Sequence, residues 1–209
     1  MLKTTTVYVA GGSGVVSATS WEPDTRTMNV FLIYAEGYGY ELLPKRVREC
    51  HPSSWTPILV PLLQMEISLR SVKDRFDFSR KRLDAVAATV HLSPYAITHL
   101  QAAQPYESLD LVHTTRELTE LSQRFSNLTW RLSGLQQLLT SLVEALQMFE
   151  YSQPTSEKNT DRNRSRCLQW RVRHLQTQVT LVQEIVVLRQ AESQAQIQTV
   201  SNITVHPRV

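Results

Sequence analysis

The chain has 209 residues, of which 42% are hydrophobic and 20% are charged, and it contains only 6 glycines and 9 prolines. This composition excludes a disordered acidic chain and a Gly/Pro-rich low-complexity protein, so we expect a folded domain. Its 22 basic residues nearly balance its 19 acidic residues, for a net charge of +3. That balance argues against a dedicated nucleic-acid binder, and no nucleic-acid partner is expected.

Cysteine usage and hydropathy indicate the compartment. The two cysteines, Cys50 and Cys167, lie far apart in the sequence with no CxxC spacing. This argues against a disulfide scaffold, a zinc knuckle and a redox pair. The N-terminus lacks the apolar segment of a signal peptide, and no stretch is long and apolar enough to span a bilayer. We therefore expect a chain that is not secreted and lies in the cytoplasm or at the cytoplasmic face of a membrane protein.

Residues 1–50 are predicted to form a small antiparallel β element. Three β-favouring runs, Thr4–Ala10, Val15–Trp21 and Met28–Tyr34, are separated by Gly-rich and Pro-containing turns. The segment Pro44–Pro52 follows them, and its prolines and basic residues predict an irregular connection.

A seven-residue apolar repeat predicts a first long helix over about residues 55–90. Apolar residues at alternate spacings of three and four form a continuous seam along one helix face. One series comprises Leu62, Leu69, Phe76, Leu83 and Val90, and the other comprises Met65, Val72 and Val86, with Ser79 as its one polar break.

The same repeat predicts two further helices, over about residues 108–150 and 163–198, joined by a polar linker at 151–162. The seam of the second helix comprises Leu111, Leu118, Leu121, Phe125, Leu128, Leu132, Leu135, Leu139, Leu142, Leu146 and Phe149. That of the third comprises Leu168, Val172, Leu175, Val179, Val182 and Val186. Because glutamine and serine dominate after Leu188, we expect the chain from about Gln190 to extend with few long-range contacts, and 201–209 to form a frayed tail.

The predicted fold is α+β and mostly α, with the N-terminal β element packed on an elongated antiparallel bundle of these three helices over residues 51–200. The heptads allow two arrangements. Either the apolar seams are buried entirely within one chain, or they also form contacts between chains in a homo-oligomer.

No motif predicts catalysis or metal binding. The run Gly11-Gly12-Ser13-Gly14 follows a strand, but it precedes another β-favouring run rather than a helix, so a plain turn is expected and not a dinucleotide site. The six histidines are scattered without HxxxH or HExxH spacing. We therefore expect no enzyme and assign no catalytic, cofactor or metal residue.

Two basic clusters stand out. One is Arg80-Lys81-Arg82, and the other comprises Arg162, Arg164, Arg166, Arg171 and Arg173. Such clusters can bind phosphates or anionic membranes. More commonly they are solvated helix faces paired with acids on neighbouring helices, and this interpretation is favoured.

Three segments resemble the cytosolic N-terminal region of fungal CorA-like divalent-cation (Mg²⁺) transporter proteins. Residues 51–66, His-Pro-Ser-Ser-Trp-Thr-Pro-Ile-Leu-Val-Pro-Leu-Leu-Gln-Met-Glu, resemble the entry to that family's first long helix. Residues 118–130 with 135–146 resemble its second helix, and residues 171–188 resemble the start of its stalk helix. The resemblance covers about residues 45–198 and rests on helical patterns of low specificity. It implies a membrane-embedded full-length relative.

The chain departs from that family where transport would be decided. The family's Gly-Met-Asn signature is absent, because the single Met28-Asn29 follows Thr27. We therefore expect a non-catalytic cytosolic or stalk domain, truncated before the pore and without transport activity of its own. The resemblance allows Mg²⁺ as a ligand but assigns no residue to it. The alternative is a coiled-coil interaction or adaptor protein unrelated to transport.

Overall fold

The computed structural model describes residues 5–11, 15–22, 27–34, 41–50, 56–89, 110–151 and 158–205. The chain divides into two compact units. Unit 1 comprises Met1–Ser71 and Arg131–Leu181, and unit 2 comprises Val72–Trp130 and Val182–Val209. Each is described in turn.

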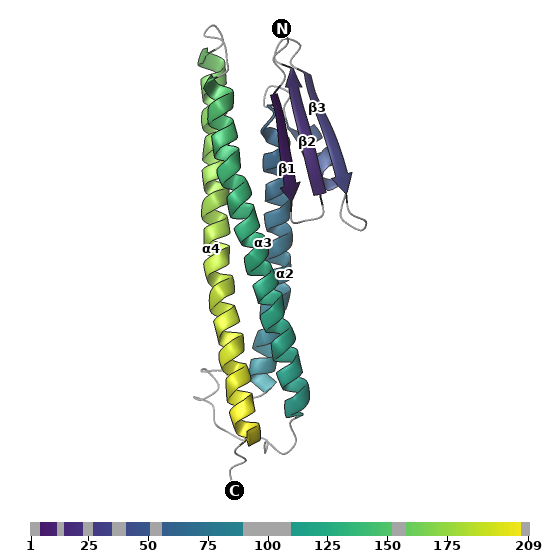
Figure 1. Cartoon of the computed structure of the whole chain (residues 1–209), viewed down its shortest axis with the longest axis vertical. Helices are drawn as coiled ribbons and strands as arrows, with labels where there is room; N and C mark the ends of the chain where they lie inside the picture. Colours follow the sequence, from purple (N-terminus) through teal and green to yellow (C-terminus); the bar gives the residue numbers. More distant parts are fainter. Residues whose placement is uncertain are drawn as a thin grey trace. The chain divides into compact units, whose positions relative to one another are not determined.

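Unit 1 begins with a three-stranded antiparallel sheet of order β1-β2-β3. The strands β1 (Thr5–Gly11), β2 (Val15–Glu22) and β3 (Thr27–Tyr34) lie side by side in Figure 1. In the register, Val7 pairs with Thr19, and Thr19 pairs with Val30. The predicted N-terminal antiparallel β element is confirmed.

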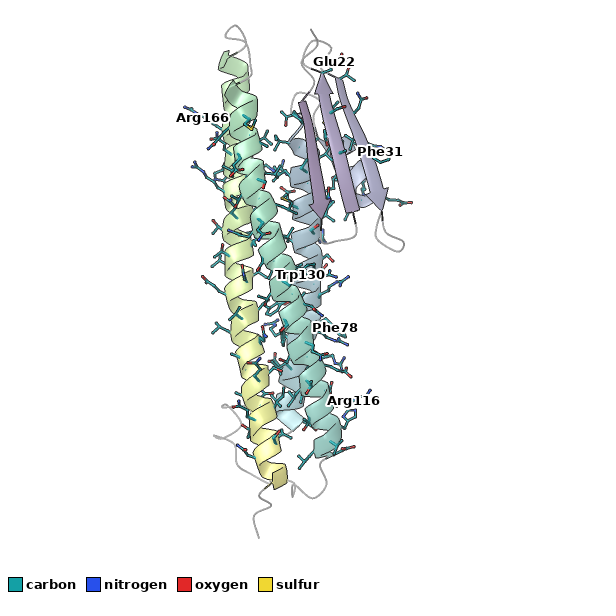
Figure 2. The ribbon with its side chains drawn as sticks, viewed as in Figure 1. Glu22, Phe31, Phe78, Arg116, Trp130 and Arg166 are labelled. Carbon is teal, nitrogen blue, oxygen red and sulfur yellow. The ribbon has the colours of Figure 1, made fainter. Side chains whose placement is uncertain are left out.

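The two faces of the sheet differ because side chains alternate along a strand. On β3, Met28 and Val30 pack against a buried cluster from the following helices. Phe31 directly follows Val30, so its side chain points to the opposite face of the sheet, where it is 65% exposed (Figure 2). The cluster comprises Leu43, Leu59, Val60 and Leu63.

A short helix, α1 (Leu42–Glu49), occupies most of the segment for which an irregular connection was predicted, and that prediction is wrong. Pro44 is tolerated because it is the third helical residue, where a backbone N–H has no intrahelical acceptor. Leu43 and Val47, four residues apart, both face the sheet cluster. Burial of this face stabilises a helix that the local sequence disfavours.

The three long helices are α2 (Leu59–Thr89), α3 (Leu111–Tyr151) and α4 (Lys158–Val205). Helix α2 begins later than predicted, and Pro61 lies in its first turn as expected. Helix α4 begins inside the predicted linker and continues past the predicted end at 198. The helical turn expected at residues 95–102 lies outside the described residues. The mostly helical fold itself is confirmed.

In unit 2, cross-helix contacts establish that α2 and α3 are antiparallel. The rings of Phe76 and Phe125 are 6.2 Å apart at their centroids. Arg82 further along α2 contacts Glu117, which lies earlier on α3. The later residue on α2 contacts the earlier residue on α3, so the two helices run in opposite directions.

Two hydrogen bonds give the relative direction of α3 and α4 in unit 2. The hydroxyl of Ser193 donates to the backbone carbonyl of Leu118 at 3.1 Å. The amide of Gln190 donates to the hydroxyl of Ser126, later on α3, at 2.8 Å. Helices α3 and α4 are therefore antiparallel.

The end of α4 contradicts the expectation that the chain from Gln190 onward has few long-range contacts. Ser193 and Val200 are fully buried, and Gln196 is 6% exposed. These residues continue the series Val172, Val179, Val186 at intervals of seven and at the interleaved position. The prediction was wrong because it assumed that only apolar residues are buried. The buried face of α4 continues at the same heptad positions, even where those positions are occupied by serine and glutamine. Residues 206–209 lie outside the described part.

Candidate interaction surfaces

The predicted seam lies inside the units rather than on a free face. Leu111 is half-buried, and the other seam residues on α2 and α3 whose burial is described are at most 8% exposed, as are those on α4 up to Val179, whereas Val182 is half-buried. In unit 1 the buried seam comprises Leu62, Met65, Leu69, Leu132, Leu135, Leu139, Leu142, Leu146, Leu168, Val172, Leu175 and Val179. In unit 2 it includes Val72, Phe76, Leu83, Val86, Leu118, Leu121, Phe125, Leu128 and Val186. These side chains pack within the chain, so a partner must use other surfaces.

Ion pairs at the edges of the seam align α2 with α4 in each unit. In unit 1 the guanidinium of Arg171 donates to Oε1 of Glu66 from Nη2 at 2.6 Å and from Nε at 3.2 Å. In unit 2 Nη1 of Arg189 donates to Oδ1 of Asp84 at 3.2 Å. Both pairs join residues 105 positions apart. In unit 2, α2 and α4 are parallel to each other, because each is antiparallel to α3.

The basic cluster at 80–82 is partly neutralised by acids. Nη2 of Arg82 lies 2.6 Å from Oε1 of Glu117 on α3. Arg80 lies 3.6 Å from Asp77, one turn earlier on α2. This cluster therefore matches the favoured interpretation of a paired, solvated helix face. The cluster on α4 behaves differently and is treated below.

A hollow of about 670 Å³ lies on unit 2, lined by α3 and α4. Its walls carry hydroxyl and amide groups with a single aliphatic side chain, and none of the described lining residues is ionisable. They are Thr119, Ser122, Gln123, Ser126, Asn127, Gln194 and Ile197. Such neutral groups can accept and donate hydrogen bonds, but they offer neither a nucleophile with a base nor a general acid.

The described residues assemble no metal or nucleotide site. Within them, no three His, Cys, Asp or Glu side chains are grouped to hold a metal ion. Gly11 ends β1, which pairs directly with β2 in an antiparallel hairpin, so the βαβ unit of a dinucleotide site is not formed there. Many hydroxyls bond to their own helix instead, as Thr129 does to the carbonyl of Phe125.

The buried polar residues Ser193 and Gln196 are the feature that sequence reasoning missed. They lie at seam positions in a Gln-rich stretch. Extending the valine series by two further heptads from Val186 would have reached Ser193 and then Val200. The seven-residue spacing therefore indicated burial of these positions, although the polar side chains there argued against it.

The chain was also compared with known proteins. No protein-family model matches it, and no curated protein matches it. Among the described helices, none contains a segment long and apolar enough to cross a membrane.

Proposed function

We propose that this chain is a non-catalytic cytosolic scaffold domain of a CorA-like divalent-cation transporter assembly, contributing helical structure rather than the ion path. The observation that carries the proposal is the order of elements. A small antiparallel sheet comes first, and three long helices follow, of which α4, with 48 residues, is the longest. The order of the three helices agrees with the resemblance of residues 51–66, 118–130 with 135–146, and 171–188 to that family's first, second and stalk helices.

The packing suits a structural role. The apolar seam and the Arg171–Glu66 pair hold α4 beside α2 in unit 1, and Ser193 ties α4 to α3 in unit 2. A helix held along its length by side-chain contacts can transmit a displacement, because packed cores resist compression. No reacting group is needed for such a role.

The proposal is tested by sequencing the transcript through and beyond the codon for Val209. Two apolar spans, the first ending in Gly-Met-Asn, would support it. A frame that continues past Val209 without such spans would overturn it. As a second measurement, the chain of 209 residues is expressed alone in a strain lacking magnesium transport. We expect no rescue of growth at low magnesium, and rescue would contradict the scaffold role.

An adaptor protein that binds partners through helices is the second candidate. The observation that favours it is a pair of exposed apolar side chains on α4 in unit 2, Ile185 at 47% and Leu188 at 68%. Being three residues apart, they share one helix face. If this face serves an adaptor, replacing both with serine should abolish association measured by sedimentation equilibrium. Unchanged sedimentation would remove this candidate's support.

A further inference from the structure

The outer face of α4 in unit 1 carries a group of exposed cationic and aromatic side chains. Arg166, Trp170, Arg173 and His174 are all exposed, and Trp170 retains 64% of its accessible surface. Spacings of three and four place them on one helix face, away from the buried seam at Leu168. Figure 2 shows Arg166 projecting outward from the helix. We name Arg166, Trp170, Arg173 and His174 the cationic–aromatic stripe.

The aromatic part of the stripe is ordered by local contacts. The rings of Trp170 and His174 stack with centroids 5.2 Å apart and planes within 5° of parallel. The imidazole Nε2 of His174 also lies 2.6 Å from Nε2 of Gln178. A tryptophan held in this way is presented to solvent with little rotamer freedom left to lose on binding.

Among the described side chains, the arginines of the stripe have no acidic partner. Arg171 is engaged by Glu66, but no described acidic side chain pairs with Arg166 or Arg173. Upstream on the same helix are further cations, at Lys158, Arg162 and Arg164, and Asp161 is the only acid in α4 before Glu184. The net charge of +3 resides in unit 1, because basic and acidic residues are equal in number in unit 2.

This concentration of positive charge opposes the helix. Arg166 and Arg173 lie two turns apart on the same face of α4, and like charges that lie close on a helix face repel each other. A sequence that bears this cost without intramolecular acids on the stripe points to anions supplied from outside.

Trp130 provides the internal contrast. It is 74% exposed on α3, at a solvent-facing heptad position like that of Trp170. Its neighbours at three and four residues are Ser126, Asn127, Ser133 and Gly134, which are all uncharged. At the same distances Trp170 has Arg166, Arg173 and His174. Exposure alone does not distinguish the two tryptophans, but the surrounding charge does.

We propose that the cationic–aromatic stripe docks on an anionic phospholipid surface. Guanidinium groups bind phosphate oxygens through paired hydrogen bonds, and tryptophan favours the boundary between headgroups and acyl chains. Together with Lys158, Arg162 and Arg164, the two arginines of the stripe make five cations, and basic clusters of four to eight residues bind anionic lipid by charge complementarity. A single-stranded nucleic acid fits less well, because it uses a groove with several free stacking faces, whereas the stripe is a convex helix face whose indole already stacks on His174. The proposal is independent of the proposed function.

Vesicle sedimentation with the full chain tests it. We expect binding to phosphatidylcholine vesicles that contain about a third phosphatidylserine, no binding to pure phosphatidylcholine, and weakening as salt rises. Each basic residue near such a surface contributes about fivefold to affinity, so Arg166→Gln with Arg173→Gln should weaken binding roughly 30-fold. The matched control, Arg116→Gln with Arg124→Gln, removes the same charge from exposed positions on α3 and should bind nearly as the parent does.

Tryptophan emission supplies a second readout. Anionic vesicles should shift the emission of the parent and of Trp130→Ala to shorter wavelength, while Trp170→Ala should lose most of that shift. Circular dichroism verifies that each variant folds. Equal binding to neutral vesicles, or an equal loss in the α3 control, would overturn the proposal. Stripe-dependent binding of a single-stranded RNA oligomer tighter than that of the vesicles would overturn the assignment to lipid.

Discussion

The cores of the two units are built on the same heptad phase with different chemistry. In unit 1 the buried seam positions are leucine, methionine or valine, and the buried polar residues Gln64 and Ser68 of α2 lie at other heptad positions. In unit 2 the seam also contains buried Ser79, Thr114, Ser193 and Gln196. The same heptad positions therefore stay buried even where polar residues occupy them. The helical backbone and the remaining apolar residues fix which face of the helix is buried.

Unit 2 compensates for only part of this polarity. Thr114 donates to the carbonyl of Asp110, and Ser193 donates to that of Leu118. Oε1 of Gln196 is buried, and no described residue bonds to it. Since an unsatisfied buried polar atom costs about 1–3 kcal/mol, Gln196 is a local weak point in the seam of unit 2.

The largest effect is expected in the apolar seam of unit 1. Leu139 is fully buried, so Leu139→Ala removes apolar burial and leaves a cavity, at a cost of about 2–5 kcal/mol. Thermal unfolding followed by circular dichroism should show a clear drop in Tm. Val112→Ala, on the same helix at a position that is 79% exposed, should change stability by less than about 0.5 kcal/mol. Equal effects of the two changes would show that the seam is assigned to the wrong face.

A stabilising change is expected in unit 2. Gln196→Met keeps the unbranched shape and removes the unpaired amide, which should raise stability by about 1–2 kcal/mol. Chemical denaturation measures it. Gln194→Met, at an exposed position two residues earlier, should be nearly neutral. A loss of stability on Gln196→Met would mean that the amide has a partner and that the contrast between the cores is smaller than inferred.

The pairs between α2 and α4 should differ in strength between the units. The side chains of Arg171 and Glu66 are 30% and 25% exposed, whereas Asp84, the partner of Arg189, is 53% exposed. A double-mutant cycle with Arg171→Gln and Glu66→Gln should give a coupling of about 1 kcal/mol that shrinks at high salt. The Arg189–Asp84 cycle should give less. A larger coupling energy for the Arg189–Asp84 pair than for the Arg171–Glu66 pair would contradict this comparison of the two units.

The smallest effect concerns the hydroxyl of Ser193. Ser193→Ala removes its bond to the Leu118 carbonyl, and that oxygen can still accept a bond from its own helix. We therefore expect a loss of only about 0.5–1 kcal/mol, with faster amide exchange in the last turns of α4. No change in exchange would indicate that Val200 alone holds this end of the helix.

The candidate surfaces were only partly foreseeable. The basic residues of α4 are visible in the sequence, yet their pattern does not distinguish Arg171, paired with Glu66, from Arg166 and Arg173. That distinction depends on which residue of α2 lies opposite, and so on the separation of 105 positions between the partners. Likewise, the neutral hollow brings together α3 and α4 residues that share no sequence signal.

By itself, the sequence determined the local structure: the β-favouring runs at the start, the three long helices and the face that each one buries. These follow from periodicity, which acts over a few residues and can be read one segment at a time. The tertiary structure alone decided that 42–49 is helical, that Ser193 and Val200 are core, and which of the described arginines pair with an acid on another helix. Burial and pairing are properties of two segments at once, and they are fixed only when distant parts of the chain meet.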